Sequence, residues 1–79
     1  MKCAVYYVDD GDFYNEEVVR KFNTIKEARK FLKDNCVKTN QGRNGYVCTY
    51  EIRKNMTNKG YDVVDWGYAR WHIKNWMQY

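Results

Sequence analysis

Residues 2–8 read KCAVYYV, and both alternating sets of side chains in this stretch are largely apolar. The two sets are Cys3, Val5 and Tyr7 on one side and Ala4, Tyr6 and Val8 on the other. A strand that is apolar on both sides is typical of the interior of a sheet, because both of its faces meet other residues. We therefore expect residues 2–8 to form a central strand.

A hairpin is predicted directly after this strand. The run DDGDFYNE contains Asp10-Gly11, a dipeptide that favours tight turns, and residues 17–22, EVVRKF, can pair back as a second strand. The segment 9–17 carries five carboxylates but does not fit a calcium loop, because Gly11 falls at the wrong position and Tyr14 occupies a ligand position. We interpret it as a solvated turn whose charges discourage edge pairing.

A helix is predicted over residues 24–35. Thr24 is a suitable N-cap, and Glu27 three residues later can complete a capping box. Apolar residues then recur at helical spacing, at Ile25, Ala28, Phe31, Leu32 and Cys36. One face of this helix is therefore expected to pack against the sheet, and the other face is expected to be solvated and basic.

Two more strands are predicted in the second half of the chain. Residues 37–45 have the glycine and asparagine content of a loop, and residues 58–60 read as a turn. Strands are expected over 46–53 and 61–66. In the first of them one alternating set should be buried, namely Tyr46, Cys48, Tyr50 and Ile52, and the other should face solvent, namely Val47, Thr49, Glu51 and Arg53.

The C-terminal stretch 66–79 fits two structures. As a helix it would pack a stripe formed by Trp66, Ala69, Ile73, Trp76 and Met77, and it would leave an aromatic set outside, with Tyr68, Trp71, His72 and Tyr79. As a strand it alternates almost as well, with Ala69, Trp71 and Ile73 on one side. Its length favours the helix.

These elements predict a single α+β domain over residues 1–79. The expected architecture is ββαββ, an antiparallel sheet of about four strands with one helix on one face and an aromatic-rich C-terminal helix or extra strand. The chain has only one leucine, but three tryptophans, eight tyrosines and three phenylalanines can supply the missing apolar burial. No stretch is apolar enough to span a membrane, and we expect an intracellular, cytoplasmic protein.

No pattern in the sequence predicts catalysis. The three cysteines and one histidine match the ligand count of a zinc site, but they lack CxxC or CxxH spacing, and Cys3, Cys36 and Cys48 all fall on faces expected to be buried. His72 is the only imidazole, and no spacing pairs it with a thiol. A phosphate-binding glycine loop is also missing. We expect a protein that is not an enzyme and that uses no cofactor, metal or small-molecule substrate.

Charge and aromatic content point to macromolecular partners. Residues 1–17 hold one lysine and five acids, a net charge of −4, and residues 18–79 hold thirteen basic and five acidic residues, a net charge of +8. One hypothesis is single-stranded nucleic-acid binding, in which cations neutralise phosphates and rings stack on bases. Its candidate residues are Lys26, Arg29, Lys30, Lys33, Lys38 and Arg43.

The favoured hypothesis is docking on a protein or nucleoprotein complex. Tryptophan, tyrosine and arginine dominate interface hot spots, and the C-terminal stretch is rich in them. The candidate contact residues are Tyr68, Arg70, Trp71, Lys74 and Tyr79. The acidic tip could add to this surface by imitating phosphates toward a basic groove.

The succession VYYVDDGDFYNEEVV and FNTIKEARKFLKDN, in about the first half of the chain, resembles the hairpin-then-helix opening of small proteins carried by bacteriophages and mobile elements. That loose set includes anti-CRISPR inhibitors. The resemblance implies a small inhibitor that acts in the host cytoplasm and occludes a host partner such as a defence nuclease. It brings no functional residue with it.

Overall fold

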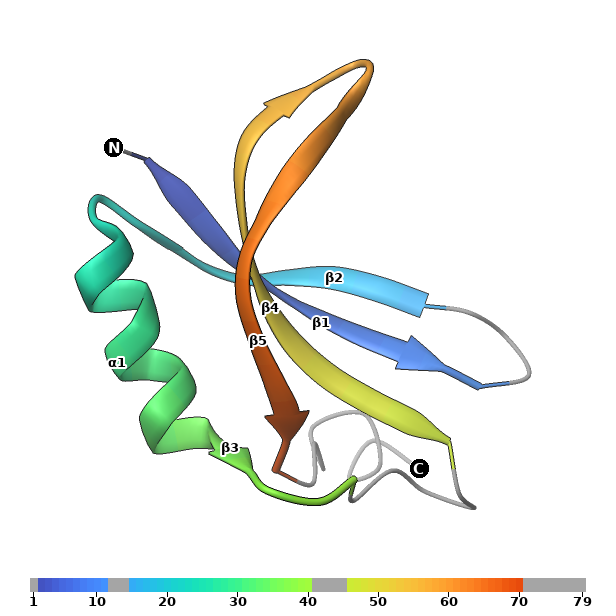
Figure 1. Ribbon diagram of the computed structural model, residues 1–79. Helices are drawn as coiled ribbons and strands as arrows, with labels where there is room; N and C mark the ends of the chain where they lie inside the picture. Colours follow the sequence, from blue (N-terminus) through green and yellow to red (C-terminus); the bar gives the residue numbers. More distant parts are fainter. Residues whose placement is uncertain (1, 12–14, 41–45, 71–79) are drawn as a thin grey trace.

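The computed structural model describes residues 2–11, 15–40 and 46–70 (Figure 1). Within these ranges the chain forms a five-stranded antiparallel sheet and one helix. The elements in chain order are β1 (Cys3–Asp10), β2 (Asn15–Phe22), α1 (Ile25–Asn35), β3 (Cys36–Val37), β4 (Val47–Thr57) and β5 (Gly60–Ala69). Their order across the sheet is β2-β1-β4-β5-β3. The predicted α+β class is therefore confirmed, with one more strand than expected.

Strand β1 occupies an interior position, as its two apolar faces predicted. It pairs with β2 on one side and with β4 on the other, both antiparallel. The pairing with β2 contains an irregularity, because Val5 lies opposite Arg20 and Tyr6 opposite Val18. Val19 is thus an extra residue, a β-bulge, and the side chains of β2 change their alternation at this point.

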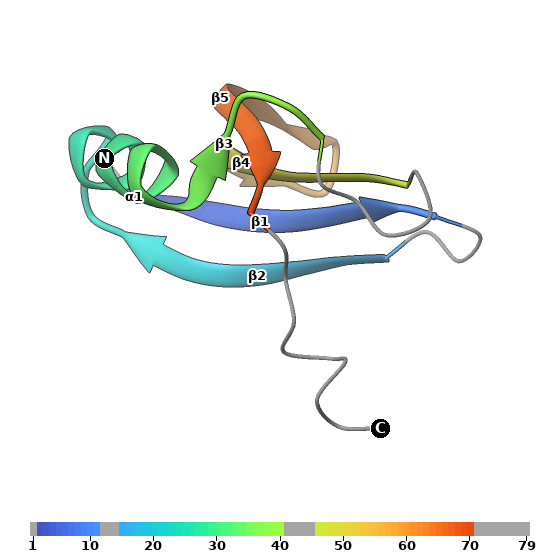
Figure 2. The ribbon, with the colours of Figure 1, turned by 90° about the horizontal axis from the view of Figure 1, so that it is seen from below.

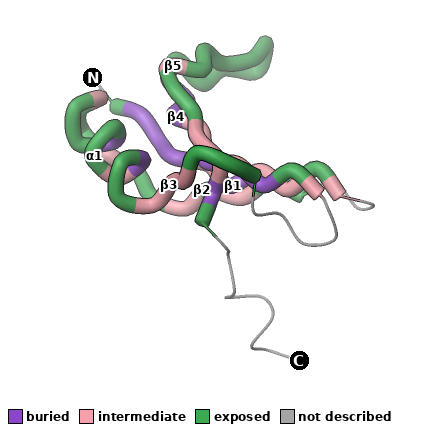
Figure 3. The backbone as a smooth tube through the Cα atoms, turned by 60° about the horizontal axis from the view of Figure 1, so that its bottom comes forward, coloured by how far each residue is buried: buried purple, intermediate pink, exposed green. Residues whose placement is uncertain are grey.

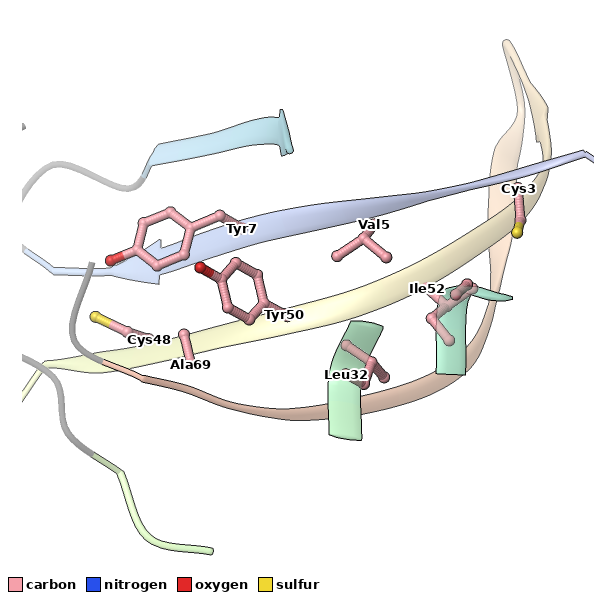
Figure 4. Packing of buried hydrophobic residues seen from close by; sticks show 9 residues of the cluster. Cys3, Val5, Tyr7, Leu32, Cys48, Tyr50, Ile52 and Ala69 are labelled. Atoms are coloured by element: carbon pink, nitrogen blue, oxygen red, sulfur yellow. The ribbon is translucent and has the colours of Figure 1, made fainter. Parts of the chain in front are cut away.

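The hydrophobic core lies on one face of the sheet, called here the inner face (Figure 4). The central strands contribute Cys3, Val5, Tyr7, Cys48, Tyr50 and Ile52, and β5 contributes Ala69. Helix α1 adds Ala28 and Leu32. The rings of Tyr7 and Tyr50 lie 5.7 Å apart between their centroids, and Phe31 meets Tyr50 edge to face at 5.5 Å. Aromatic side chains therefore supply much of the core of this leucine-poor chain.

The start of α1 follows the predicted capping arrangement. The backbone N–H of Glu27 donates to the Thr24 hydroxyl oxygen at 3.2 Å, and that hydroxyl donates to the Glu27 carboxylate at 2.9 Å. The helix covers one end of the inner face rather than its whole length (Figure 2). An ion pair of 3.5 Å between Arg29 and Asp65 links it to β5. In the described part of the chain no helix has the length and apolarity needed to cross a membrane.

Two expectations for the second half are corrected. Val37, the first residue of the predicted 37–45 loop, instead belongs to strand β3, in which Cys36 and Val37 pair with Ala69 and Tyr68 of β5. Strand β5 continues to Ala69, so for residues 66–69 the favoured helix is wrong and the alternative strand is the structure formed. Residues 71–79 lie outside the described residues. Gly67 permits this close approach of β3, because a Cβ at residue 67 would lie only 2.9 Å from the Cys36 side chain.

The β4–β5 hairpin extends beyond the rest of the sheet as an exposed arm, residues 55–62 (Figures 1 and 3). The register shifts between Lys54 and Thr57, where Asn55 has a positive φ of 54°. Asparagine tolerates this conformation better than most residues, and its side-chain amide donates to Asp62 at 2.8 Å. The arm therefore turns at a defined bulge and not at an arbitrary point.

Replacing Thr24 by alanine should lower the free energy of unfolding by about 1 kcal/mol, because the Glu27 N–H loses its acceptor. Urea unfolding followed by far-UV circular dichroism measures the change. The matched control is Thr39→Ala, which removes an exposed threonine outside the helix and should have little effect. Equal effects of the two substitutions would contradict the capping role.

Stability should fall as pH rises above about 9, because several buried groups resist ionisation in the folded state. Burial raises the pKa of the Cys36 thiol from 9.0 to about 11. Burial also raises the pKa of Tyr7, and a hydrogen bond with Cys48 and the charge of Asp9 act in the same direction. The unfolded chain therefore loses these protons first, so the stability present below the unfolded pKa values is lost at higher pH.

Urea unfolding in the presence of a reductant, from about pH 8 to pH 11, tests this expectation; each proton can contribute a slope of at most about 1.4 kcal/mol per pH unit. The variant Tyr7→Phe keeps the ring and removes one titrating hydroxyl, so its stability should fall less steeply above pH 10. An unchanged slope in this variant would show that Tyr7 does not carry the effect.

Candidate interaction face

The sheet face opposite the core, called here the outer face, carries three rows of side chains that lie directly opposite one another. The register of the paired strands defines them. The middle row runs Val18, Tyr6, Glu51, Trp66 from β2 to β5. The row on one side is Glu16, Val8, Thr49, Tyr68, and the row on the other side is Lys21, Ala4, Arg53, Val63. No described helix covers this face, because α1 packs on the inner one.

Large apolar side chains on the outer face remain open to solvent. Trp66 is 53% exposed, Val18 is 47% exposed and Val63 is 46% exposed, and Tyr61 on the arm is also exposed. The Trp66 ring meets Tyr68 edge to face, with centroids 5.2 Å apart. Scattered exposed apolar residues are ordinary, but residues gathered on one sheet face are typical of a binding surface.

Arg53, in the row with Ala4 and Val63, is the most buried residue of this face, with 2% of its surface exposed. Its guanidinium lies between two aromatic rings, 4.1 Å from the Tyr6 centroid and 4.0 Å from the Tyr61 centroid. It also donates to two carboxylates, to Glu16 at 2.8 Å and to Glu51. Four strands therefore meet at one cation, because Glu16 belongs to β2, Tyr6 to β1, Glu51 to β4 and Tyr61 to β5.

The two carboxylates keep Arg53 charged inside the protein. Burial alone lowers the pKa of the guanidinium, but the hydrogen bonds and charges of Glu16 and Glu51 outweigh burial and hold the pKa above its ordinary value. In return, Arg53 balances one of the two negative charges, so the three groups together carry a net charge of −1. Lys21, in the same row as Arg53, makes the acids and bases of the three rows equal in number, and aromatic rings flank the buried cation.

The structure describes two of the five predicted contact residues. Tyr68 is half-buried on the outer face, and Arg70 is exposed just after β5, where its backbone N–H donates to the Asn35 carbonyl at 3.0 Å. Trp71, Lys74 and Tyr79 lie outside the described residues. Trp66, which the helical interpretation placed in the packed stripe, is instead exposed beside Tyr68.

Four of the six predicted nucleic-acid residues lie on α1, on the other side of the sheet from the outer face. Lys26, Arg29, Lys30 and Lys33 are exposed on α1, and Lys38 is exposed after β3, whereas Arg43 lies outside the described residues. Acidic partners reduce this basic character. Arg29 pairs with Asp65 and Lys30 with Asp34, both at 3.5 Å. The basic helix and the aromatic outer face are therefore separated by the sheet itself.

An open groove runs between α1 and the end of β2. It is lined by Arg20, Phe22, Glu27, Lys30, Phe31, Asp34 and Asn35. Glu27 is engaged by the helix cap, and Lys30 by Asp34, so three of the four charged groups of the groove have local polar partners. Among the described residues no three acidic, cysteine or histidine side chains cluster as metal ligands would. The predicted packing role of Cys3, Cys36 and Cys48 is confirmed, since each contributes to the core or packs against it.

Sequence reasoning missed the residue at the centre of the site. The alternation in β4 correctly predicted that Cys48, Tyr50 and Ile52 are buried, but it placed Arg53 on the solvent side. That expectation is wrong because the rings of Tyr6 and Tyr61 and the carboxylate of Glu16, all from other strands, enclose the guanidinium. The sequence did contain a pattern that predicts the exposure of Trp66 and Tyr68. These large residues alternate with the small Gly67 and Ala69, as in a strand whose one face packs closely against other residues.

Comparison of the chain with protein-family models, with curated proteins and with solved structures finds no match.

The substitution Arg53→Lys should lower the free energy of unfolding by about 2 kcal/mol, because an ammonium cannot stack flat between two rings while it bonds to two carboxylates. Urea unfolding measures the loss. The matched control is Arg20→Lys, since Arg20 also lies over a ring, that of Phe22 at 5.3 Å, but is exposed. The control should change stability by less than about 0.5 kcal/mol. Similar losses in both variants would contradict the central role of Arg53.

Proposed function

We propose that this chain is a non-catalytic binding protein that uses its outer face to dock on a protein or nucleoprotein partner and to cover that partner's working surface. The observation that carries the proposal is the gathering of exposed Val18, Tyr61, Val63 and Trp66 around the buried Arg53. Aromatic and aliphatic anchors at the centre of a patch, with few net charges, are the composition of interface cores.

The exposed rings and the exposed cations of α1 lie on opposite sides of the sheet, and this separation favours a protein partner over a single nucleic-acid strand. Strand binding needs cations that follow the phosphates and rings that stack on the bases along the same path. Here the exposed rings of Tyr61 and Trp66 lie on the outer face, and the cations of α1 lie beyond the inner face. Arg53, the buried cation of the outer face, is already engaged by Glu16 and Glu51 and is therefore not available to bind phosphates.

The finer identity of the partner rests on the sequence. The hairpin-then-helix opening resembles that of small phage and mobile-element inhibitors, and it favours a host nucleic-acid enzyme, such as a defence nuclease, as the occluded partner. On this proposal the chain inhibits by covering a site, so it needs surface complementarity and no reacting group.

The double variant Val63→Lys, Trp66→Lys should abolish partner capture while leaving the fold intact, because both side chains are already about half exposed. Immobilised protein is incubated with host lysate, and captured proteins are identified by mass spectrometry. The matched control is Lys30→Glu, Lys33→Glu, which reverses two exposed charges on α1 and should capture the same partner as the unchanged chain.

A gel-shift titration of these two double variants at two salt concentrations separates protein docking from nucleic-acid binding. Binding of RNA or DNA that weakens steeply with salt and that disappears in the α1 variant would favour the nucleic-acid function. A partner that the outer-face variant and the α1 variant capture equally would contradict docking through the outer face.

A further inference from the structure

Among the described residues, strand β2 forms one long edge of the sheet. It spans eight residues, Asn15–Phe22, and lies at the end of the strand order, where it pairs with β1 and with no other described strand. The opposite end of the sheet is different, because β3 is only two residues long. An edge of this length presents a row of backbone donors and acceptors that a further strand can bind.

The charges along this edge are divided into two halves. Glu16 and Glu17 stand before the central valines, and Arg20 and Lys21 stand after them. In an antiparallel pair of identical strands, the first half of one strand lies opposite the second half of the other. Opposite charges would then meet at both ends of the pair, whereas a parallel arrangement would place like charges together.

The bulge at Val19 brings these charges onto matching faces. Glu17 and Arg20 both lie on the inner face, opposite Tyr7 and Val5 of β1. In a regular strand two residues three positions apart would point to opposite faces. The extra residue removes this mismatch, so Glu17 of one copy and Arg20 of a second copy can lie opposite each other on one face.

The same register matches the outer face. Glu16 and Lys21, opposite Val8 and Ala4 of β1, both lie on the outer side. They are five positions apart and would also point to opposite faces without the bulge. One antiparallel register therefore pairs both acids with both bases, and two-fold symmetry repeats every pair.

We propose that β2 binds β2 of a second copy of this chain, antiparallel, and that the two five-stranded sheets join into one continuous sheet. The occupant of the edge is fixed by charge complementarity, because charges that discourage pairing with unrelated strands favour an inverted copy of the same sequence. Val18, which is 47% exposed, lies near the two-fold axis. The dimer also places two outer faces side by side, although it does not depend on the function proposed for that face.

The test is sedimentation equilibrium of the full chain with two single charge reversals, Glu17→Lys and Arg20→Glu. The unchanged chain should dimerise with a Kd in the range of roughly micromolar to millimolar, as expected for a small interface. Each variant alone should dimerise at least about tenfold more weakly, because like charges then meet twice across the two-fold axis. Both substitutions avoid Glu16, so the Arg53 contacts remain.

An equimolar mixture of the two variants should recover the dimer. The introduced lysine of one chain then faces the introduced glutamate of the other, while the native Glu17 and Arg20 that remain also face each other. The double variant Glu17→Lys, Arg20→Glu should dimerise like the unchanged chain for the same reason. A mixture that stays monomeric, variants that dimerise as well as the unchanged chain, or an unchanged chain that is monomeric at about 1 mM would overturn the proposal.

Hydrogen exchange of the unchanged chain gives a readout that does not depend on the variants folding. Amides of β2 should exchange more slowly at high than at low protein concentration, whereas amides of the β4–β5 arm should not change. Protection of the arm alone would place the interface elsewhere and overturn the proposal. The protection of β2 amides does not depend on whether the outer-face variant captures a partner. The dimer proposal and the docking proposal can therefore be overturned independently.

Discussion

The Arg53 guanidinium holds together the sheet face that no described helix covers. A single helix of eleven residues can cover only part of one face of a five-stranded sheet, and α1 is used on the inner face. On the outer face the same stabilisation must come from side chains of the sheet itself. Arg53 provides it by joining Glu16 of β2, Tyr6 of β1 and Tyr61 of β5 around β4.

This arrangement explains how the outer face can be apolar at its surface and ordered beneath it. The stack on Tyr61 fixes the angle of the exposed arm, because the arm cannot swing without removing a ring from the guanidinium. The bulge at Asn55 then sets where the arm bends. Trp66 and Val63 are thus presented on a rigid background, and a rigid surface loses less conformational entropy when it binds a partner.

Local patterns predicted the parts of the fold that depend on local sequence. The two apolar faces of β1 and the capping residues Thr24 and Glu27 are visible within a few positions, and both expectations are confirmed. The burial of Arg53 could not be predicted in this way, because its carboxylate partner Glu16 lies 37 positions earlier in the chain. The sequence left residues 66–69 open between helix and strand because they fit both patterns, and only pairing with β3 and β4 decides between the two.

The presence of an arginine at position 53 is not explained by stability alone. Apolar residues of similar volume often replace a buried ion pair without loss, because the charges must first be removed from water. An apolar residue at this position would, however, leave the carboxylates of Glu16 and Glu51 unneutralised beside the exposed Trp66 row. It would also lack the flat, charged plane that orients the ring of Tyr61. Arg53 therefore lowers the negative charge of the face and fixes its shape, and both effects are properties that a docking surface requires more than a stable sheet does.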